Sequence, residues 1–267
     1  FSIQADAALR ERLSFADADR GIVLTDDVTP FRERKVRLLN GAHTLLAPVG
    51  ILCGCPTVGE AVADATLGTF VRRLLLDELA PSVGSQTTEA FALDVLDRFA
   101  NPFLDHALRD ITLQQTAKLR IRVIPSLAAY TRKAGRPPSS IAFGFAAWLS
   151  FMRPDLHEQR LRDPATQRPD DHADHVATLW NQDATTAHRH AGDGREGGLA
   201  HEDARASSIV RAVLADVSLW GGDLTLVPGF ADAVTDALIR IERNGVRSAL
   251  EHHLAPSAPA AEIEART

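Results

Sequence analysis

Apolar residues recur at helical spacing along most of this 267-residue chain. From Pro30 onward they stand three and four positions apart with polar residues between them, which is typical of amphipathic helices. The pattern predicts helices over residues 30–48, 57–79, 87–99, 103–121, 139–152, 171–181, 204–219 and 229–251. A short strand is predicted at residues 22–25. Helices joined by short connections, with almost no strands, predict a mainly α, multi-helix domain.

Two of these helices have recognisable starts. Thr29 followed by Pro30 predicts a hydroxyl cap with proline in the first helical position. Thr57 with Glu60 three residues later predicts a capping box. Residues 188–201, which contain four glycines and no apolar period, are expected to form a mobile surface loop. The Ala- and Pro-rich residues 255–267 are expected to be a disordered tail.

Composition and charge narrow the function classes. The net charge is −6, and no run of Lys and Arg supplies the basic face that nucleic-acid binding needs. No apolar stretch reaches about 18 residues, so no membrane span is predicted. Phe1 is not followed by a secretory signal, so we expect a cytoplasmic protein. Cys53 and Cys55 are too close for a disulfide, and we expect them to be reduced and buried.

The helix predicted at residues 30–48 carries three polar residues in unusual places. At about 100° per residue, Lys35, Asn40 and His43 fall within one arc of a largely apolar helix. A lysine in apolar surroundings can exchange a proton near neutral pH, and an asparagine amide can stabilise a developing alkoxide. The structural alternative is that Lys35 reaches solvent, Asn40 caps a turn and His43 is a hydrogen-bonded core histidine.

The pattern Lys35-x4-Asn40-x2-His43 resembles the signature of the C-terminal domain of the mannitol dehydrogenase family. Three further segments agree in order: Thr57-Val-Gly-Glu-Ala-Val, Arg98-Phe-Ala-Asn-Pro and Trp220-Gly-Gly-Asp-Leu-Thr-Leu-Val-Pro-Gly. The sequence around Lys35 is most similar to that of the tagaturonate reductase (altronate oxidoreductase) branch of the family. The resemblance runs from about residue 23 to residue 250.

This resemblance implies a helical domain like the C-terminal domain of 6-phosphogluconate dehydrogenase. It also implies a preceding Rossmann domain that binds NAD, and the start at Phe1 suggests a piece of a longer protein. Residues 1–28 would be the end of that domain or its linker, and residues 29–254 the helical substrate-binding and catalytic domain. No Gly-x-Gly-x-x-Gly follows a strand anywhere in the chain, so its cofactor-binding residues are expected elsewhere.

The resemblance also implies roles for individual residues. Lys35 would be the general acid/base, Asn40 would polarise the reacting oxygen, and His43 would contact the substrate. The expected reaction interconverts a ketouronate, tagaturonate, with its aldonate, altronate. Alternatives are a mannitol- or fructuronate-type 2-dehydrogenase, or a non-catalytic helical ligand-binding domain.

Arg32 is the candidate residue for determining substrate specificity. It lies one turn before Lys35, where the positive end of the helix disfavours a cation. We therefore expect its guanidinium to bind the carboxylate of a sugar acid. The alternative is a surface arginine paired with Asp26 or Asp27.

Arg109 and Lys118 correspond to a segment that lines the family's substrate pocket, and the resemblance makes them candidate substrate contacts. This chain departs from the family pattern there, with His106 in place of an acid and Gln-Gln-Thr-Ala before Lys118. Arg120 and Arg122 further along are equally compatible with a pair at a helix C-terminus. His172 and His175 have a spacing that could hold a metal, but we expect no metal because the family's chemistry uses a lysine.

Overall fold

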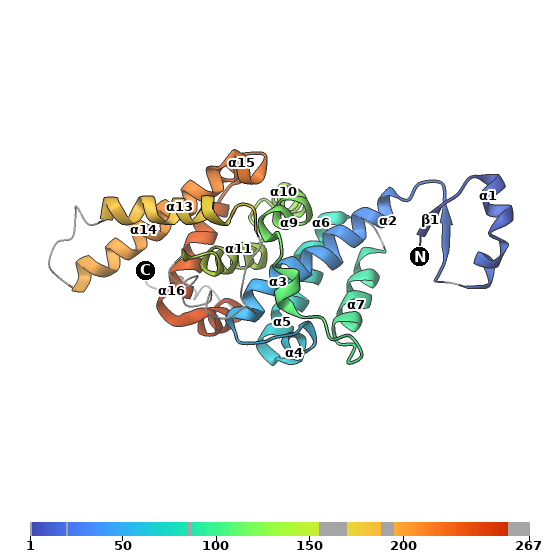
Figure 1. Ribbon diagram of the computed structural model, residues 1–267, viewed down its shortest axis with the longest axis horizontal. Coiled ribbons are helices and arrows are strands. Elements are labelled where there is room, and N and C mark those ends of the chain that lie inside the picture. The colour runs from blue at the N-terminus through green and yellow to red at the C-terminus, as the bar shows by residue number, and fades with distance from the viewer. Residues whose placement is uncertain (1, 20, 85–86, 155–169, 188–194, 256–267) are drawn as a thin grey trace, which may run out of the picture.

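The computed structural model describes residues 2–19, 21–84, 87–154, 170–187 and 195–255. Helices make up most of this part of the chain, which confirms the predicted mainly α fold. Among the described helices, none is both long enough and apolar enough to cross a bilayer. Figure 1 shows a helical body that holds α3 to α16 and a small lobe at the N-terminal end.

The elements have these bounds in chain order: β1 Ser2–Gln4, α1 Ala7–Arg12, η1 Ser14–Ala18, β2 Val23–Thr25, α2 Thr29–Arg34, η2 Lys35–Asn40, α3 Gly41–Leu52, α4 Val58–Ala63, α5 Ala65–Arg73, η3 Leu74–Leu79, α6 Ala80–Val83, α7 Thr88–Phe99, α8 Leu108–Ile111, α9 Gln115–Arg122, α10 Ile124–Ala134, α11 Ser139–Phe151, α13 Ala173–Ala187, α14 Arg195–Ala215, α15 Val217–Trp220, η5 Leu224–Leu226 and α16 Phe230–Leu254. The elements η2 and η3 are π-helical turns, while η1 and η5 are 3₁₀ turns.

Most of the predicted helices are present, but several predictions were wrong in their continuity. The helix predicted at 204–219 is interrupted at Asp216, whose extended backbone separates α14 from α15, and α16 contains a non-helical residue at Gly245. The helix predicted at residues 57–79 is interrupted at Asp64, whose extended backbone ends α4 and whose carboxylate caps α5. In the helix predicted at 103–121, residues 103–107 are not helical, and Gln114 adopts a left-handed conformation (φ 51°) between α8 and α9. Helix α10 was not predicted, although Pro125 and Gly135 mark its two ends.

Some of the predicted helix caps and loops are present in the structure and others are not. Thr57 accepts a hydrogen bond from the Glu60 N–H, which is the first half of the predicted capping box, while the Glu60 carboxylate accepts from the Thr57 hydroxyl at 3.3 Å. The predicted Thr29 cap was wrong, because helix α2 already includes Thr29 and the Asp27 carboxylate accepts the Thr29 N–H at 2.8 Å. The predicted loop at residues 188–201 was wrong from residue 195 on, where α14 has begun. Residues 188–194 and the predicted tail at 256–267 lie outside the described residues.

The core is organised around α11, which is buried from Ser140 to Phe151. It packs between α3 and α16, and α14 then covers α16. The contact with α3 is close, because a Cβ on Gly144 would lie 2.6 Å from the Leu45 side chain. On the α16 side, Phe145 meets Phe230 edge-to-face with ring centroids 5.3 Å apart.

A buried carboxylate from a different helix caps the N-terminus of α11. Glu78, in η3, is 4% exposed and accepts the N–H groups of Ser140 at 2.6 Å and Ile141 at 2.9 Å. The first N–H groups of a helix have no partner within the helix, and a negative charge there is favourable. Burial raises the pKa of the Glu78 carboxyl, while these backbone hydrogen bonds oppose that rise. The central helix is thus fixed at its start by η3.

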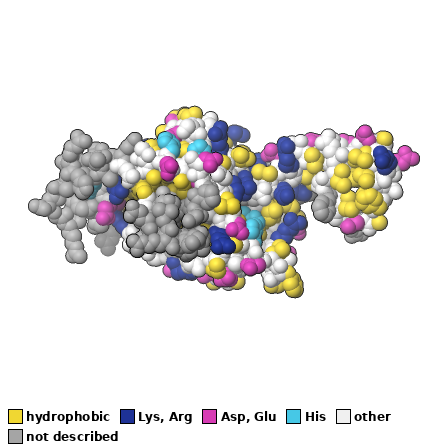
Figure 2. Space-filling model, in the orientation of Figure 1, with side chains coloured by type: hydrophobic (Ala, Val, Ile, Leu, Met, Phe, Trp, Pro, Cys, Tyr) yellow, Lys and Arg dark blue, Asp and Glu magenta, His cyan; other side chains and the backbone are white. Residues whose placement is uncertain are grey.

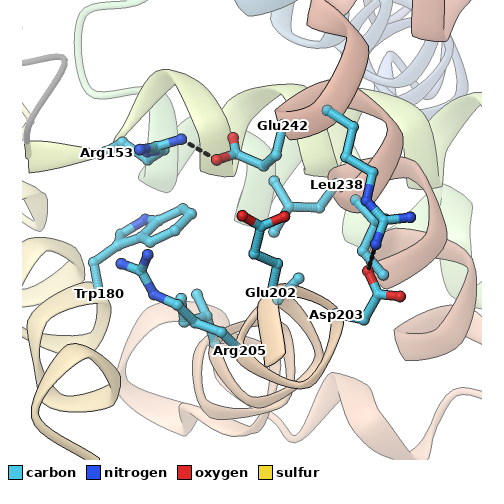
Figure 3. A pocket seen from close by; sticks show the side chains of 11 residues that line it. Arg153, Trp180, Glu202, Asp203, Arg205, Leu238 and Glu242 are labelled. Carbon is cyan, nitrogen blue, oxygen red and sulfur yellow. Dashed lines mark hydrogen bonds and ion pairs between the residues drawn. The ribbon is translucent and has the colours of Figure 1, made fainter. Parts of the chain in front are cut away.

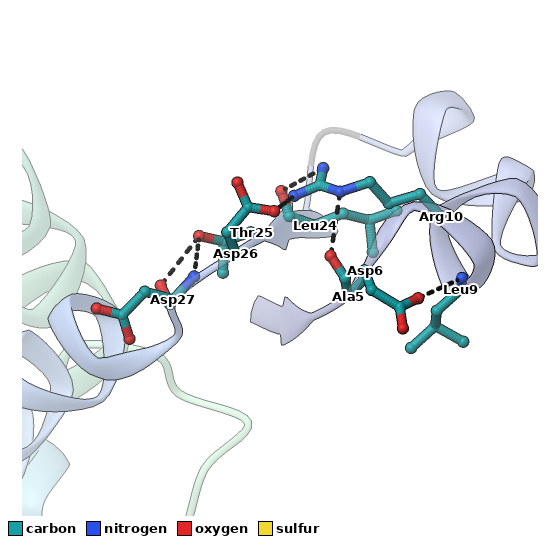
Figure 4. A network of polar contacts seen from close by, with 8 residues as sticks. All are labelled: Ala5, Asp6, Leu9, Arg10, Leu24, Thr25, Asp26 and Asp27. Atoms are coloured by element: carbon teal, nitrogen blue, oxygen red, sulfur yellow. Dashed lines mark hydrogen bonds and ion pairs between the residues drawn. The ribbon is translucent and has the colours of Figure 1, made fainter.

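The N-terminal lobe is a small unit joined to the body through α2 (Figure 1). Strands β1 and β2 pair in parallel, with Ile3 opposite Leu24. Figure 4 shows that Arg10 holds the lobe together, donating to the carbonyls of Ala5 and Leu24 and pairing with Asp26 at 2.9 Å. A two-stranded sheet is marginal alone, and Arg10 adds a link between the segment after β1 and strand β2.

Glu78→Ala should lower the free energy of unfolding by about 2–4 kcal/mol, because it leaves buried N–H groups of α11 without acceptors. Asp77→Ala, at the exposed neighbouring position, is the matched control and should change it by less than about 0.5 kcal/mol. Denaturant unfolding of both variants gives the comparison. A loss below about 1 kcal/mol in Glu78→Ala would show that the cap is dispensable.

Candidate functional site

The three predicted catalytic residues lie on one uninterrupted helical segment formed by α2, η2 and α3. Lys35 begins the π-helical turn η2, Asn40 ends it, and His43 lies in the first turn of α3. The predicted common arc assumed regular α-helical spacing. A π turn holds more residues than an α turn, so the angle between Lys35 and His43 differs from the predicted one. Such turns occur often at functional sites.

Lys35 is exposed in this structure. The prediction that it lies in apolar surroundings was therefore wrong for this chain by itself. Asn40 is half-buried, and its backbone carbonyl accepts the Thr44 hydroxyl at 2.7 Å. Within the described part of the chain its side-chain amide makes no hydrogen bond, which leaves the amide hydrogens available to a ligand.

His43 is the most strongly perturbed group of the three. Its ring stacks on Phe99 with centroids 4.2 Å apart and meets His106 edge-on at 5.0 Å. Burial, together with the charges of His106 and Arg122, lowers the pKa of the His43 imidazole to about 3. His43 is therefore neutral at neutral pH. A neutral imidazole can donate one hydrogen bond and accept another, as contact with a substrate hydroxyl requires.

Helix α9 brings two cationic side chains to the same region. The half-buried Lys118 donates to the Ile111 carbonyl at 2.9 Å. Burial lowers the pKa of Lys118, as does the neighbouring charge of Arg122, one turn further along. Arg122 donates to the Thr44 hydroxyl at 3.2 Å, which ties α9 to the turn of α3 that follows Asn40. Lys118 is therefore on the same helix as Arg122, whose charge acts on His43.

Gln115 and Asp170 complete the wall behind these cations. The fully buried Gln115 donates its amide to the Thr44 carbonyl at 2.5 Å, while its side-chain oxygen is buried without a partner among the described residues. Asp170 accepts the N–H and hydroxyl of Thr116 on one oxygen and the His172 N–H on the other. Gln115 thus fixes α9 against α3, and Asp170 joins α9 to the segment before α13.

The two other predicted substrate contacts are exposed. Arg32 faces solvent, and its charge contributes to lowering the pKa of Asp27, after the larger effect of the hydrogen bonds from Thr29. Asp26 is paired with Arg10, so it is not the partner that the structural alternative offered to Arg32. Arg109 is exposed, with its Nε 3.6 Å from the Asp110 carboxylate.

Sequence reasoning missed two residues of this site, Phe99 and Thr44, which contact His43 and Asn40. It named Arg122 only as a possible member of a pair at a helix C-terminus, whereas Arg122 bonds Thr44 and its charge acts on His43. The spacing of Lys118 and Arg122, four residues apart, was a signal that both lie on one face of a helix. Figure 2 shows histidine and Lys or Arg side chains together where α3 and the segment before α8 meet.

The remaining sequence candidates lie away from this cluster. Among the described residues, no group of three or more His, Cys, Asp or Glu is placed to hold a metal ion. His175 instead bonds the Asp216 carboxylate at 2.5 Å. Cys53 and Cys55 are free thiols and only partly buried, and burial raises the pKa of Cys53 to about 11.

A cavity of about 620 Å³ lies elsewhere, between α13, α14 and α16. Figure 3 shows Arg153 above Trp180, with Arg205 and Glu202 reaching in from α14. None of the predicted site residues lines it. The predicted residues Lys35, Asn40, His43 and Lys118 lie instead on η2, α3 and α9.

Comparisons with known proteins show which family has the same helical domain. The family model for the mannitol dehydrogenase C-terminal domain matches residues 27–242. An altronate oxidoreductase from Yersinia enterocolitica is 35% identical over 255 residues, covering 94% of this chain and 48% of that protein. An altronate oxidoreductase from Bacillus subtilis is 33% identical over 243 residues, covering 91% and 45%.

The solved structures show the fold. A Pseudomonas fluorescens mannitol 2-dehydrogenase, in ternary complex with NAD and D-mannitol, superposes with a TM-score of 0.68 at 23% identity. That match covers 88% of this chain and 43% of the other. A D-sorbitol dehydrogenase in substrate-free form gives a TM-score of 0.58 at 21% identity, covering 86% and 42%. The chain spans about half the length of the curated relatives it matches.

Acid should destabilise the protein through His43. The folded-state pKa of about 3 lies below the ordinary 6.5, so the unfolded chain binds a proton that the folded chain does not. The free energy of unfolding should therefore fall as pH drops from about 6.5 towards 3, with no contribution above that window. In His43→Gln this slope should be shallower, as measured by denaturant unfolding at a series of pH values. An identical slope in the variant would contradict the assignment.

Proposed function

The chain belongs to the mannitol dehydrogenase C-terminal domain family, and from this premise we propose that it is the substrate-binding and catalytic domain of an NAD-dependent oxidoreductase. The proposed reaction interconverts the ketouronate tagaturonate and the aldonate altronate. Relatives named altronate oxidoreductase, 33–35% identical to this chain, support that substrate. One observation supports this proposal most directly. Lys35, Asn40 and the neutral His43 lie on one helical segment, beside the cations of α9.

In this proposal each residue handles the substrate oxygen in a different way. Lys35 donates a proton to the oxygen of the reduced carbonyl and accepts it in the reverse direction. The free amide of Asn40 donates a hydrogen bond to that oxygen as negative charge develops on it. His43, held by its stacking on Phe99, orients a neighbouring substrate hydroxyl without adding charge.

The cofactor belongs to a different part of the protein. The described residues contain no glycine-rich turn from a strand into a helix that could hold a dinucleotide, so they do not fit NAD. NAD supplies or accepts hydride when bound, and its binding residues are expected in a preceding Rossmann domain. Residues 1–28 would be the end of that domain or its linker, followed by the helical domain at 29–254.

Two surface features support the presence of that partner domain. Phe103 is 91% exposed and Leu104 55% exposed, and both precede His106 beside the site. Phe15 is 58% exposed on the N-terminal lobe, next to a parallel strand pair too small to be stable alone. A docked domain would cover these side chains and would also remove Lys35 from solvent, which its proposed role as acid/base favours.

Substrate contacts follow from the same arrangement. Lys118, half-buried one turn before Arg122, is proposed to bind a substrate oxygen. Arg32 and Arg109 are exposed and are proposed as outer contacts that a sugar acid meets at the entrance. Their charge favours an acid over a neutral polyol.

Lys35→Met should reduce kcat for ketouronate reduction by about 10²- to 10⁴-fold, because it removes the proposed proton donor at nearly unchanged volume. The measurement is loss of NADH absorbance with tagaturonate, using the protein together with its preceding domain. Glu33→Gln, an exposed change two residues away, is the matched control and should keep most of the activity. Turnover in Lys35→Met equal to that of the control would exclude Lys35 as the acid/base.

A further inference from the structure

A half-buried guanidinium without a carboxylate partner lies beside the proposed reacting centre. Arg122 ends α9, and among the residues that the structure describes no carboxylate lies within ion-pair distance of it. Lys118, one turn before it on the same helix, is bonded to a neutral carbonyl. The nearby Asp170 uses both carboxylate oxygens for hydrogen bonds from Thr116 and His172. Two cations are thus partly desolvated together, and an anion would relieve that cost.

The guanidinium is also held in a defined position. One of its nitrogens donates to the Thr44 hydroxyl at 3.2 Å, and that hydroxyl donates to the Asn40 carbonyl at 2.7 Å. The backbone carbonyl of Arg122 lies 3.4 Å from the position a Cβ would take on Gly41, so α9 and α3 are in close contact there. Arg122 is therefore linked directly to the turn that carries Asn40 and His43, while its remaining donors stay available.

We infer that Arg122 is the residue that binds the carboxylate of the sugar-acid substrate, with Lys118 as its second cation. This inference rests on the proposed function and deepens it. A sugar acid carries its carboxylate a few carbon atoms from the carbonyl, so the anion site must lie beside Asn40 and His43. Arg122 meets that condition, and its fork of donors suits a carboxylate.

Arg32 and Arg120 offer the contrasts that make the inference specific. Arg32 is exposed and already near the Asp27 carboxylate, so it has less need of a substrate anion. Arg120 lies on the same helix as Arg122 but points to a different part of the molecule. Its guanidinium packs against Gly221, where a Cβ would lie 2.7 Å from it.

The test compares Arg122→Gln, Arg122→Lys and Arg120→Gln in the protein together with its preceding domain. Arg122→Gln should raise KM for tagaturonate by about 10- to 100-fold, because it removes charge-assisted hydrogen bonds to the substrate. KM for a neutral ketose, fructose, should change by less than about threefold in the same variant, since that substrate has no carboxylate. Arg122→Lys should recover part of the affinity by keeping the charge, and Arg120→Gln should leave KM for both substrates near the parent value.

The outcomes separate this inference from the proposed function. A parent protein that does not reduce tagaturonate overturns both. A parent that reduces it, with an unchanged tagaturonate KM in Arg122→Gln, overturns only the role of Arg122. Equal losses on tagaturonate and fructose, with a lowered melting temperature, show a purely structural role and also overturn it. A large rise in KM in Arg32→Gln with none in Arg122→Gln assigns the carboxylate to Arg32 instead.

Discussion

The hydrogen bonds from the start of α11 to the Glu78 carboxylate are the constraint on which the rest of the helical body depends. A helix buried along its whole length cannot satisfy its first N–H groups with water, so another element must supply the acceptor. Glu78 does so from η3, a turn that also packs against α3. Helix α11 packs directly on Leu45 of α3. The position of Glu78 therefore also fixes α3, the helix that carries His43 and directly follows Asn40.

Structural features that depend on a few neighbouring residues could be predicted from the sequence. Thr57 was predicted as a helix cap and accepts the Glu60 N–H, and the apolar period from Pro30 predicted a helix that is present from Thr29 to Leu52. Features that depend on contacts between distant residues were not. Thr44 accepts from Arg122, 78 residues away, and no local pattern encodes that pair. The interruption at Asp64 could have been predicted, since aspartate is a preferred helix cap. It was not, because the apolar residues continue at helical spacing across Asp64.

The site divides in the same way. Lys35, Asn40 and His43 are candidates because of their spacing on one helix, whereas the π turn between them leaves no simple mark in a sequence. The neutrality of His43 depends on Phe99 and on the charges of His106 and Arg122, which come from other segments. The exposure of Lys35 has a different cause, because burial there would have to come from a surface outside the described residues. A helix can thus be predicted more reliably than the environment of its functional groups.

The π turn of η2 has a consequence for how this site could change over time. It holds one residue more than an α-helical turn, so loss of a single residue between Lys35 and Asn40 could leave the helix continuous. Because the wider turn already absorbs the extra residue, the helix before it and the helix after it would keep nearly the same rotation about their common axis. The packing of α3 in the core would be kept, and only the spacing of side chains within the turn would change. Gain or loss of one residue in this turn is therefore a change that the fold can absorb and that acts mainly on the side chains of the site.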